Sequence, residues 1–400
     1  MGRVWLTSAN SVVFWVGTGP HPVLKNIPEG KPVKTATTNF KRFGSIAAIA
    51  IAGTMLFSAC ASNEGGAPAD SESTLSGTLD GAGASSQDSA QQAWVAAFQI
   101  ENPDVTINYE PSGSGAGREA FIAGGVSFAG TDSALSDEEI AGEFGSCVAD
   151  TGYVQVPAYI SPIAVIFNVE GVEELNVDAT VLANIFKGTI TTWDDAAIVA
   201  LNEGVTLPSA PITAVHRSDD SGTTKNFSDY LGKVAPDVWD AEATDTFPYP
   251  DAKGEAAQGT SGVVSAVTDG TNTIGYADAS KAGDLGVAKL KVGDEFVSYS
   301  PEAAAAVVDG SPAVEGRDAT DLAIKLDRNT TDPTHYPLVL VSYIVACQEY
   351  TDAEVGPLVH DYVAYLTSEA GQAEAASSAG AAPLSSELSA KVATAIESIK

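Results

Sequence analysis

The most informative short segment of the chain reads His216-Arg217-Ser218-Asp219-Asp220-Ser221-Gly222-Thr223-Thr224. It joins a strand-like stretch at residues 212–216 to a helix-like stretch at residues 224–231. Glycine lets a backbone approach a ligand closely, and serine and threonine hydroxyls can donate hydrogen bonds. A helix that starts after such a loop presents unpaired N–H groups and a positive dipole end. The segment is therefore typical of an anion-binding turn, and the guanidinium of Arg217 could hold two oxygens of one oxyanion.

Three other stretches share this composition of glycine and small polar residues. They read Gly81-Ala82-Gly83-Ala84-Ser85-Ser86-Gln87, Ser112-Gly113-Ser114-Gly115-Ala116-Gly117 and Gly130-Thr131-Asp132-Ser133. Each stretch alone is more typical of an ordinary turn and helix cap than of a ligand site. The four together predict an anion cradle, in which Arg217 is the only fixed positive charge. We expect Asp219 to hold this guanidinium in place, although a lone arginine is more often a surface salt-bridge partner.

The remaining chain alternates between strand-like and helix-like segments. Strand-like runs lie at residues 105–109, 154–156, 164–167, 212–216, 273–276 and 338–346. Helix-like runs lie at residues 88–99, 137–144, 178–187, 194–202, 224–231, 262–269, 352–368 and 387–399, and several begin with an N-capping Asp or Thr. This alternation predicts an α/β fold with largely parallel sheets. A chain of 400 residues exceeds the size of one hydrophobic core, so two lobes are expected.

The composition excludes several classes of function. The chain has 52 acidic and 20 basic residues, a net charge of −32, and an ordinary hydrophobic fraction of 44%. A field of this sign repels nucleic acid and anionic lipid, and it favours a soluble monomer. A small anion can still bind, because a site is governed by its local donors. The cysteines and histidines show no zinc spacing, so neither a metal site nor a cofactor is expected.

The N-terminal region has the pattern of an export signal. Lys41 and Arg42 precede an apolar run at residues 46–59, which is too short to span a bilayer comfortably. The run ends Leu56-Phe57-Ser58-Ala59-Cys60, which resembles a lipobox, the motif whose cysteine receives a diacylglycerol. A plain signal peptide with a chance cysteine is the alternative. We expect a leader at residues 1–59, with translation starting at Val33, and a flexible lipid-anchored linker at residues 60–74.

Two cysteines remain once Cys60 is assigned to the lipid. An exported chain occupies a compartment where disulfides persist, and an even remainder suggests that Cys147 pairs with Cys347. Two buried free thiols are the alternative.

The four polar stretches, in this order and spacing, resemble the phosphate-binding proteins of bacterial high-affinity phosphate importers. The family pattern has a GAGA-[ST] turn, a GSG or GSS loop, an SD-x-x-L-[ST] segment and an RxDxSGT loop. The third of these is read here as Thr131-Asp132-Ser133-Ala134-Leu135-Ser136, and secondary marks are Gly188-Thr189-Ile190-Thr191-Thr192-Trp193-Asp194-Asp195 and Ile274-Gly275-Tyr276. The resemblance covers about residues 75–400, and the RxDxSGT loop is its most specific part.

The sequence departs from this family pattern at two places. Ser86-Gln87 stands where many relatives have Phe-Pro, and Ser86 still offers its main-chain N–H to a ligand. Asp220 stands where glycine is common. Asp220 adds negative charge beside the site and so bears on affinity. Arg118 is expected either to offset this charge or to be a solvated base on a helix.

The resemblance implies a type-II periplasmic-binding-protein fold: two α/β lobes joined by two crossing strands, with the ligand in the cleft. Matching positions places the crossings near residues 156–162 and 334–338. The first lobe would comprise residues 75–157 and 338–400, and the second residues 158–337. The resemblance also implies that inorganic phosphate is the ligand and that the partner is the permease of an ATP-driven importer. The location would be the extracellular face of the cell membrane, through the lipid anchor.

Carried over to this sequence, the resemblance implies hydrogen-bond donors from both lobes around one acceptor. The donors would be Ser85 (hydroxyl), Ser86 (N–H), Ser114 (both), Arg217, Ser221, Gly222 and Thr223, with Asp219 orienting Arg217 and Asp132 as the acceptor. A carboxylate facing an anion is unfavourable unless the anion has a proton to donate, which phosphate has near neutral pH and sulfate lacks. The alternative role for Asp132 is a helix N-cap, for which Ser136 and Asp137 are better placed.

Three rival functions follow from the same residues. An enzyme is disfavoured, because the sequence has no Gly-x-Ser-x-Gly elbow, no nucleotide-binding Gly-x-x-x-x-Gly-Lys-Ser/Thr loop and no metal-ligand cluster for phosphatase chemistry. A receptor for another oxyanion, such as sulfate or molybdate, is disfavoured by Asp132. A cell-surface phosphate sensor without an importer is compatible with every residue pattern described above.

Overall fold

Two long apolar strands run side by side through the middle of the fold, β4 (Tyr153–Asn168) and β12 (Val339–Cys347). The computed structural model describes residues 75–249, 252 and 254–400, so the predicted leader, the predicted lipid attachment at Cys60 and the predicted linker lie outside the described residues. The two strands pair antiparallel, from Val339 opposite Pro162 to Cys347 opposite Tyr153. Every residue of β12 is buried, as a strand covered on both faces requires.

Strand β4 corrects one sequence expectation. The runs at residues 154–156 and 164–167 were expected as separate strands, yet they belong to one continuous strand. Pro157 lies opposite Tyr343, where the register with β12 shifts between Ser342 and Tyr343. Strands tolerate proline at such irregularities because one ladder hydrogen bond is already missing there. Pro157 therefore lies at a bulge within one strand.

Parallel strands extend the sheet on both sides of the central pair, in the order β2-β1-β3-β12-β4-β8-β6-β7. The first strand group is β1 (Gly77–Gly83), β2 (Val105–Glu110) and β3 (Phe128–Thr131), and the second is β6 (Thr213–Arg217), β7 (Gly254–Ala257) and β8 (Thr273–Asp278). Pairing is parallel within each group. It is antiparallel where β12 meets β3 and where β4 meets β8. The prediction of parallel sheets therefore holds within the groups and fails at the centre.

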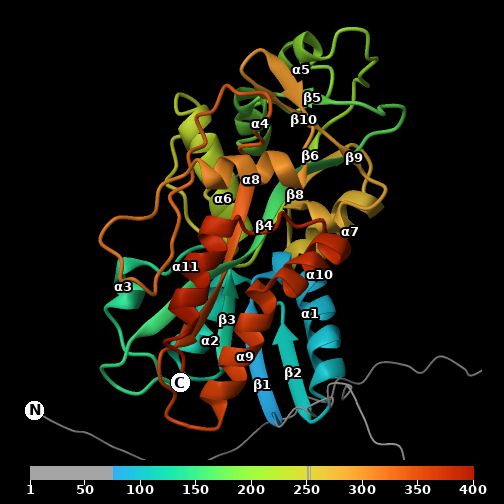
Figure 1. Cartoon of the computed structure of the whole chain (residues 1–400). Helices are drawn as coiled ribbons and strands as arrows, with labels where there is room; N and C mark the ends of the chain where they lie inside the picture. Colours follow the sequence, from blue (N-terminus) through green and yellow to red (C-terminus); the bar gives the residue numbers. More distant parts are fainter. Residues whose placement is uncertain (1–74, 250–251, 253) are drawn as a thin grey trace, which may run out of the picture. The chain divides into compact units, whose positions relative to one another are not determined.

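The helices around the first strand group lie in the lower half of Figure 1. They are the 3-10 helix η1 (Ser85–Gln87), α1 (Asp88–Glu101), α2 (Ser114–Ile122), α3 (Asp137–Ile140), α9 (Val355–Thr367), α10 (Glu369–Ala379) and α11 (Ser386–Ile396). Helices α2 and α10 were not expected, because their many glycine, alanine and serine residues conceal the apolar period. The helix expected at residues 137–144 ends at Ile140, just before Gly142.

The helices around the second strand group lie in the upper half of Figure 1, next to a small separate sheet. They are α4 (Ala179–Phe186), α5 (Ala196–Leu201), α6 (Gly222–Val234), α7 (Gly259–Asp269), the 3-10 helix η2 (Ala279–Lys281) and α8 (Pro301–Asp309). The small sheet has the order β11-β10-β5, from β5 (Asn176–Val177), β10 (Lys289–Val292) and β11 (Glu295–Val297); β9 (Gly286–Val287) pairs with β4.

Aromatic side chains fix the elements that carry the polar stretches. In the first strand group, Phe128 of β3 lies 5.6 Å from the ring of Tyr362 on α9. In the second, Phe227 of α6 stacks on Tyr276 of β8 at 4.2 Å. Buried rings of this size contribute much of the packing energy of a core. The ends of β3 and α6 are thereby held in place, close to Asp132 and Gly222.

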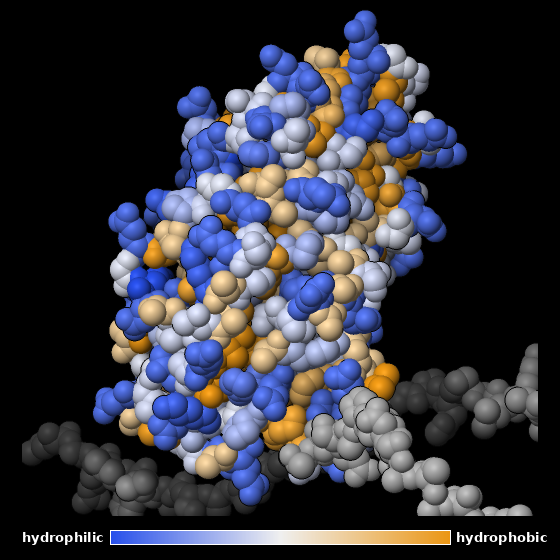
Figure 2. Space-filling model, viewed as in Figure 1, coloured by the Kyte–Doolittle hydropathy of each residue, from blue (hydrophilic) through white to orange (hydrophobic). Residues whose placement is uncertain are grey.

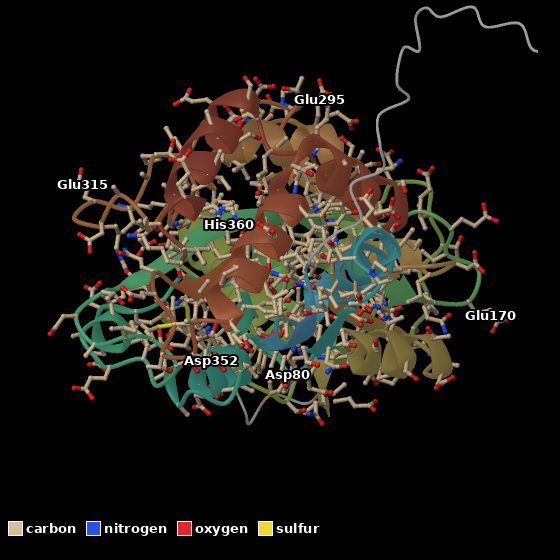
Figure 3. The ribbon with its side chains drawn as sticks, turned by 60° about the horizontal axis from the view of Figure 1, so that its bottom comes forward. Asp80, Glu170, Glu295, Glu315, Asp352 and His360 are labelled. Carbon is tan, nitrogen blue, oxygen red and sulfur yellow. A yellow bond between two sulfur atoms is a disulfide. The ribbon has the colours of Figure 1, made fainter. Side chains whose placement is uncertain are left out.

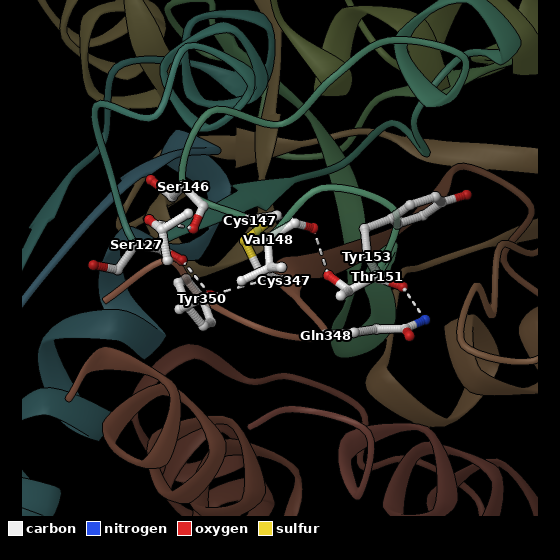
Figure 4. The surroundings of a disulfide bond; sticks show 10 residues. Ser127, Ser146, Cys147, Val148, Thr151, Tyr153, Cys347, Gln348 and Tyr350 are labelled. Carbon is white, nitrogen blue, oxygen red and sulfur yellow. Dashed lines mark hydrogen bonds between the residues drawn. A yellow bond between two sulfur atoms is a disulfide. The ribbon is translucent and has the colours of Figure 1, made fainter. Parts of the chain in front are cut away.

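A disulfide joins Cys147 to Cys347, which confirms the predicted pairing and rules out two free thiols. Figure 4 shows its surroundings, in which the hydroxyl of Tyr350 donates to the carbonyl of Ser127 at 2.5 Å. The same hydroxyl accepts from the N–H of Cys347 at 3.1 Å. The bond closes a sequence separation of 200 residues and ties the loop before β4 to the end of β12.

Exposed acidic side chains occur in segments far apart in the sequence. Asp80, Glu170, Glu295, Glu315 and Asp352 are exposed, and Figure 3 shows Glu170, Glu295 and Glu315 well apart near the outline of the molecule. The face seen in Figure 2 is mostly hydrophilic, with hydrophobic residues in small scattered patches. Among the helices of the described residues, none combines the length and the apolar character needed to cross a bilayer.

Candidate anion-binding site

The four polar stretches follow the carboxyl ends of four strands, three in the first strand group and one in the second. Ser85 comes after β1, Ser114 after β2, Asp132 after β3 and Arg217 at the end of β6. Ligands of α/β sheets bind outside the carboxyl ends of strands, because helix N-termini gather there. The two strand groups point these ends at each other across β4 and β12, so that the predicted residues meet.

The stretch after β6 makes direct contact with the stretches after β2 and β3. Thr223 Oγ1 donates to Asp132 Oδ2 at 3.0 Å, and the N–H of Gly115 donates to the carbonyl of Asp220 at 3.0 Å. A methyl group at Gly222 would lie 2.7 Å from both Asp132 Cβ and Ser114 Oγ. Only glycine at position 222 permits this approach.

Asp132 is the acceptor at the centre of the arrangement and is only 4% exposed. Its Oδ1 accepts from the hydroxyls of Ser86 and Ser342, each at 2.6 Å. Burial raises the pKa of Asp132, and its three hydroxyl donors and the nearby charge of Arg217 limit the rise. Asp132 does not cap a helix: Ser136 caps α3, in a capping box with Glu139.

Arg217 is 3% exposed and is held by Asp219. Its Nε donates to Asp219 Oδ1 at 2.7 Å, and its Nη2 forms a second hydrogen bond with Asp219 Oδ2. Burial alone would raise the pKa of Asp219, but the bonds from Arg217 and the N–H of Gly259 outweigh it and lower the pKa. Among the described residues, Nη1 of Arg217 has no acceptor, so one edge of the guanidinium is left for a ligand.

Main-chain N–H groups at three helix starts complete the cradle. Ser114 is the first residue of α2, and Gly222 and Thr223 are the first two of α6, while Ser86 lies in η1. The first N–H groups of a helix have no partner within it. Ser221 caps α6 by accepting from the N–H of Thr224, which leaves its own hydroxyl proton available. All of these residues are buried.

Two predicted donors have partners that the sequence did not indicate. Ser85 Oγ accepts from the N–H of Thr260 and lies 3.0 Å from Thr260 Oγ1. The hydroxyl of Thr223 is engaged with Asp132, so its main-chain N–H remains for an anion. Thr260 lies in Gly259-Thr260-Ser261-Gly262, a fifth stretch with the composition of the other four, and that composition was the available signal.

Further residues behind the site were missed. Ser342 is the one serine in the otherwise largely apolar strand β12, and its place between buried neighbours was the only sign. Asn226 of α6 donates to the carbonyls of Asp132 and Gly222, at 2.8 and 2.9 Å. Arg328 donates to Asn226 Oδ1 at 2.6 Å and keeps it oriented. Burial lowers the pKa of Arg328, which is satisfied by Asp229 and by two main-chain carbonyls.

Neither expectation for Arg118 holds. Arg118 is 8% exposed and makes ion pairs with Glu139 at 2.8 Å and Asp245 at 2.7 Å. It therefore joins the segments after β3 and α6, and it is no solvated base. Asp220 does not face Arg118: its carboxylate is exposed and accepts from Thr246 at 2.8 Å.

Two cavities border the cradle. One of about 410 Å³ lies beside Asp132, with Lys225 and Asn226 in its wall. Another of about 260 Å³ lies beside Ser85 and Thr260. The described residues contain no group of three or more histidine, cysteine, aspartate or glutamate side chains that could hold a metal ion.

The fold and the position of this site define a solute-binding protein of the periplasmic type. Residues 68–370 match the family model described as the PBP superfamily domain. The chain is 35% identical over 291 residues to phosphate-binding protein PstS 3 of Mycobacterium leprae (strain TN), covering 72% of this chain and 78% of that protein. It is 31% identical over 384 residues to phosphate-binding protein PstS 2 of Mycobacterium tuberculosis (strain ATCC 25618 / H37Rv), covering 90% and 99%. The chain belongs to this PstS family of phosphate-binding proteins.

Solved structures share the fold. The high-affinity periplasmic phosphate-binding protein PfluDING, solved with bound phosphate, matches with a TM-score of 0.65 at 22% identity, over 80% of this chain and 93% of that chain. The phosphate-binding protein of Stenotrophomonas maltophilia matches with a TM-score of 0.61 at 20% identity, over 80% and 94%. These likenesses confirm the predicted α/β periplasmic-binding fold.

Proposed function

We propose that the chain binds inorganic phosphate outside the cytoplasm and delivers it to the permease of an ATP-driven importer. The observation that carries the proposal is Asp132, one buried acceptor surrounded by donors, in a chain of the phosphate-binding family. The donors are the N–H groups of Ser86, Ser114, Gly222 and Thr223, the hydroxyls of Ser85 and Ser221, and the guanidinium of Arg217. No catalytic step and no cofactor takes part.

The site balances the negative charge of the bound anion mainly through oriented hydrogen bonds. Arg217 is already paired with Asp219, so its contribution is geometric as much as ionic. The remaining positive potential comes from the starts of η1, α2 and α6, where N–H groups and helix dipoles converge. Such a site binds an anion in a chain of net charge −32, because its donors are local and buried.

Asp132 supplies the selectivity. An ionised carboxylate can only accept, so the ligand oxygen facing it must carry a proton. Phosphate satisfies this at neutral pH, whereas sulfate would place two buried acceptors against each other, at a cost of about 2–3 kcal/mol or more.

We propose that the two lobes comprise residues 75–157 with 338–400, and residues 158–337. The contacts Thr223–Asp132, Asn226–Asp132 and Arg118–Asp245 join these segments and support a closed arrangement around the ligand. Cys147 and Cys347 belong to the same proposed lobe, so their bond is compatible with lobe movement.

We further propose that the protein is a monomer, anchored by a lipid on Cys60.

The test replaces Asp132 by Asn and measures phosphate and sulfate binding by titration calorimetry at pH 7.5. Asn keeps the shape but can donate, so phosphate affinity should fall by roughly tenfold or more and sulfate binding should become measurable. The matched control is Asp137→Asn, five residues along, whose side chain is 96% exposed; it should bind like the wild type. Sulfate binding by the wild type as strong as phosphate binding would refute the proposal.

A further inference from the structure

A chain of buried hydrogen bonds leads from α9 to the carboxylate of Asp132. Tyr362 Oη lies 2.8 Å from Gln91 Oε1, and Gln91 Nε2 lies 2.8 Å from Gln87 Oε1. Gln87 Nε2 lies 2.7 Å from Ser342 Oγ, which lies 2.6 Å from Asp132 Oδ1. Each of the four residues behind Asp132 is at most 1% exposed. We call this set of four residues the donor relay.

One main-chain carbonyl fixes the direction of the whole relay. Gln87 Nε2 also donates to the carbonyl of Tyr343 at 3.2 Å, and a flipped amide would set two acceptors against each other there. Gln87 Oε1 must then face Gln91, so Gln91 presents its Nε2. The hydroxyl oxygen of Ser342 accepts a hydrogen bond from Gln87, so the hydroxyl donates its own hydrogen to Asp132. Every hydrogen bond therefore points toward the carboxylate.

Local backbone features place these side chains. Ser342 precedes the register shift between β12 and β4, a bulge that can re-aim a side chain toward the cleft. Gln87 passes so close to β3 that a methyl group at Gly130 would lie 2.8 Å from its Oε1. The relay thus depends on one glycine and one bulge, and neither feature was predicted from the sequence.

The relay decides how much of Asp132 is open to a ligand. An ionised carboxylate offers about four lone-pair positions. Ser86 and Ser342 occupy both positions on Oδ1, and Thr223 occupies one on Oδ2. One acceptor position on Oδ2 is left.

We propose that Gln87 and Ser342 are specificity-determining positioning residues, which keep Asp132 ionised and open at one position, so that the site accepts an oxyanion with one proton facing it. This inference rests on the proposed function and adds the residues that enforce its selectivity. Neither residue touches the ligand; both act through Asp132. Aligned hydrogen bonds of this kind polarise one another inside a protein, which strengthens the last donor.

The charged and titratable groups around Asp132 come from several elements. They are Tyr109 of β2, Arg118 of α2, Arg217 of β6, Lys225 and Asp229 of α6, Asp245 and Arg328. Burial raises the pKa of Asp132, and the bond from Ser342 is among those that limit the rise. Loss of this donor must raise that pKa further. A protonated Asp132 can donate, so sulfate is then accepted at a higher pH.

The experiment measures phosphate and sulfate affinity between pH 4.5 and 8 for the wild type, Ser342→Ala and Gln87→Glu. Gln87→Glu keeps the shape but turns the proton of Ser342 away from Asp132. Both variants should lose about tenfold in phosphate affinity at neutral pH, and the pH at which sulfate binding begins should rise by about one unit. Gln92→Glu, the same change on the exposed face of α1, should keep the wild-type profile.

The outcomes separate two failures. If the wild type binds no phosphate, the proposed function is wrong. If the wild type binds phosphate but either folded variant keeps the wild-type pH profile for sulfate, the proposed role of the donor relay is overturned. This holds even where phosphate affinity drops, because a purely structural role would lower affinity without moving the pH profile. Thermal unfolding identifies a misfolded variant, and the other variant then decides.

Discussion

Asp278 shows at the residue scale how burial sets the chemistry of a carboxyl group in this protein. It is fully buried at the end of β8 and accepts from the hydroxyl of Tyr159 at 3.0 Å and the N–H of Ser280 at 3.0 Å. Burial raises its pKa to about 6, against the opposing effect of these hydrogen bonds. Folding therefore favours the neutral form of Asp278 relative to the unfolded chain, and ionisation at higher pH weakens the fold.

This gives a prediction for stability against pH. The folded pKa lies above the unfolded value, so the stability from the neutral form is present in acid and is lost as the pH rises through about 6. Asp278→Asn cannot ionise. Between pH 4 and pH 8 the variant should gain about 2 kcal/mol in unfolding free energy relative to the wild type, measured by urea denaturation. A constant difference at both pH values would disprove the assignment.

Residues close in sequence could be predicted, and residues brought together by topology could not. The pairing of Arg217 with Asp219 follows from their spacing, and it is present. The glycine- and serine-rich composition led to the stretches that converge around Asp132. Ser342 reaches the carboxylate of Asp132, and Asn226 its main-chain carbonyl, only because β12 and α6 pack there, and no local pattern encodes these contacts.

At the element scale, the start of α6 sets how closely the two halves of the site approach. The helix is capped by Ser221 and begins at Gly222, two residues before the start expected from the sequence. Its first residue, Gly222, faces Asp132 and Ser114 with no room for a methyl group. The N–H groups of α6 can therefore contact a ligand held from the other side.

Gly222→Ala tests this approach. The added carbon must push the halves apart or displace Asp132, at a cost of about 1–3 kcal/mol, so phosphate affinity should fall between fivefold and roughly a hundredfold. The control is Gly232→Ala on the same helix, where the nearest atom would be 3.7 Å away. That variant should bind phosphate normally and be slightly more stable. Equal affinities for the two variants in calorimetry would contradict the tight approach.

Some elements were less predictable than others for clear physical reasons. Helices with a strong apolar face, such as α4 and α9, carry the 3.6-residue period and were expected. The small-residue helices α2 and α10 lack it. Strand β4 was expected as two separate runs, and its continuity depends on pairing with β12, where the register shifts next to Pro157.

At the scale of the whole molecule, the disulfide and the site are separate in their effects. Cys147 lies in the loop before β4, and Cys347 is the last residue of β12. Tyr350 and Ser127 lie next to the disulfide (Figure 4). Asp132 lies at the other end of the pairing between β3 and β12. The bond restricts the unfolded chain over a long separation, which is where cross-links stabilise most.

Replacing both cysteines by serine should therefore lower stability without affecting binding. The unfolding free energy should fall by about 2–5 kcal/mol in urea denaturation. Phosphate affinity of the folded double variant should stay within about twofold of the wild type. Loss of phosphate binding by a variant that is still folded would show that the bond also positions the site.

The most direct measurement of the central claim is an experimental structure of the protein crystallised with phosphate. The account predicts one phosphate between the stretches after β1, β2, β3 and β6, with Nη1 of Arg217 on its oxygens. A phosphate oxygen should lie within hydrogen-bond distance of Asp132 Oδ2, while Oδ1 keeps Ser86 and Ser342. Phosphate bound away from both Arg217 and Asp132, or in contact with Oδ1 in place of Ser342, would contradict it.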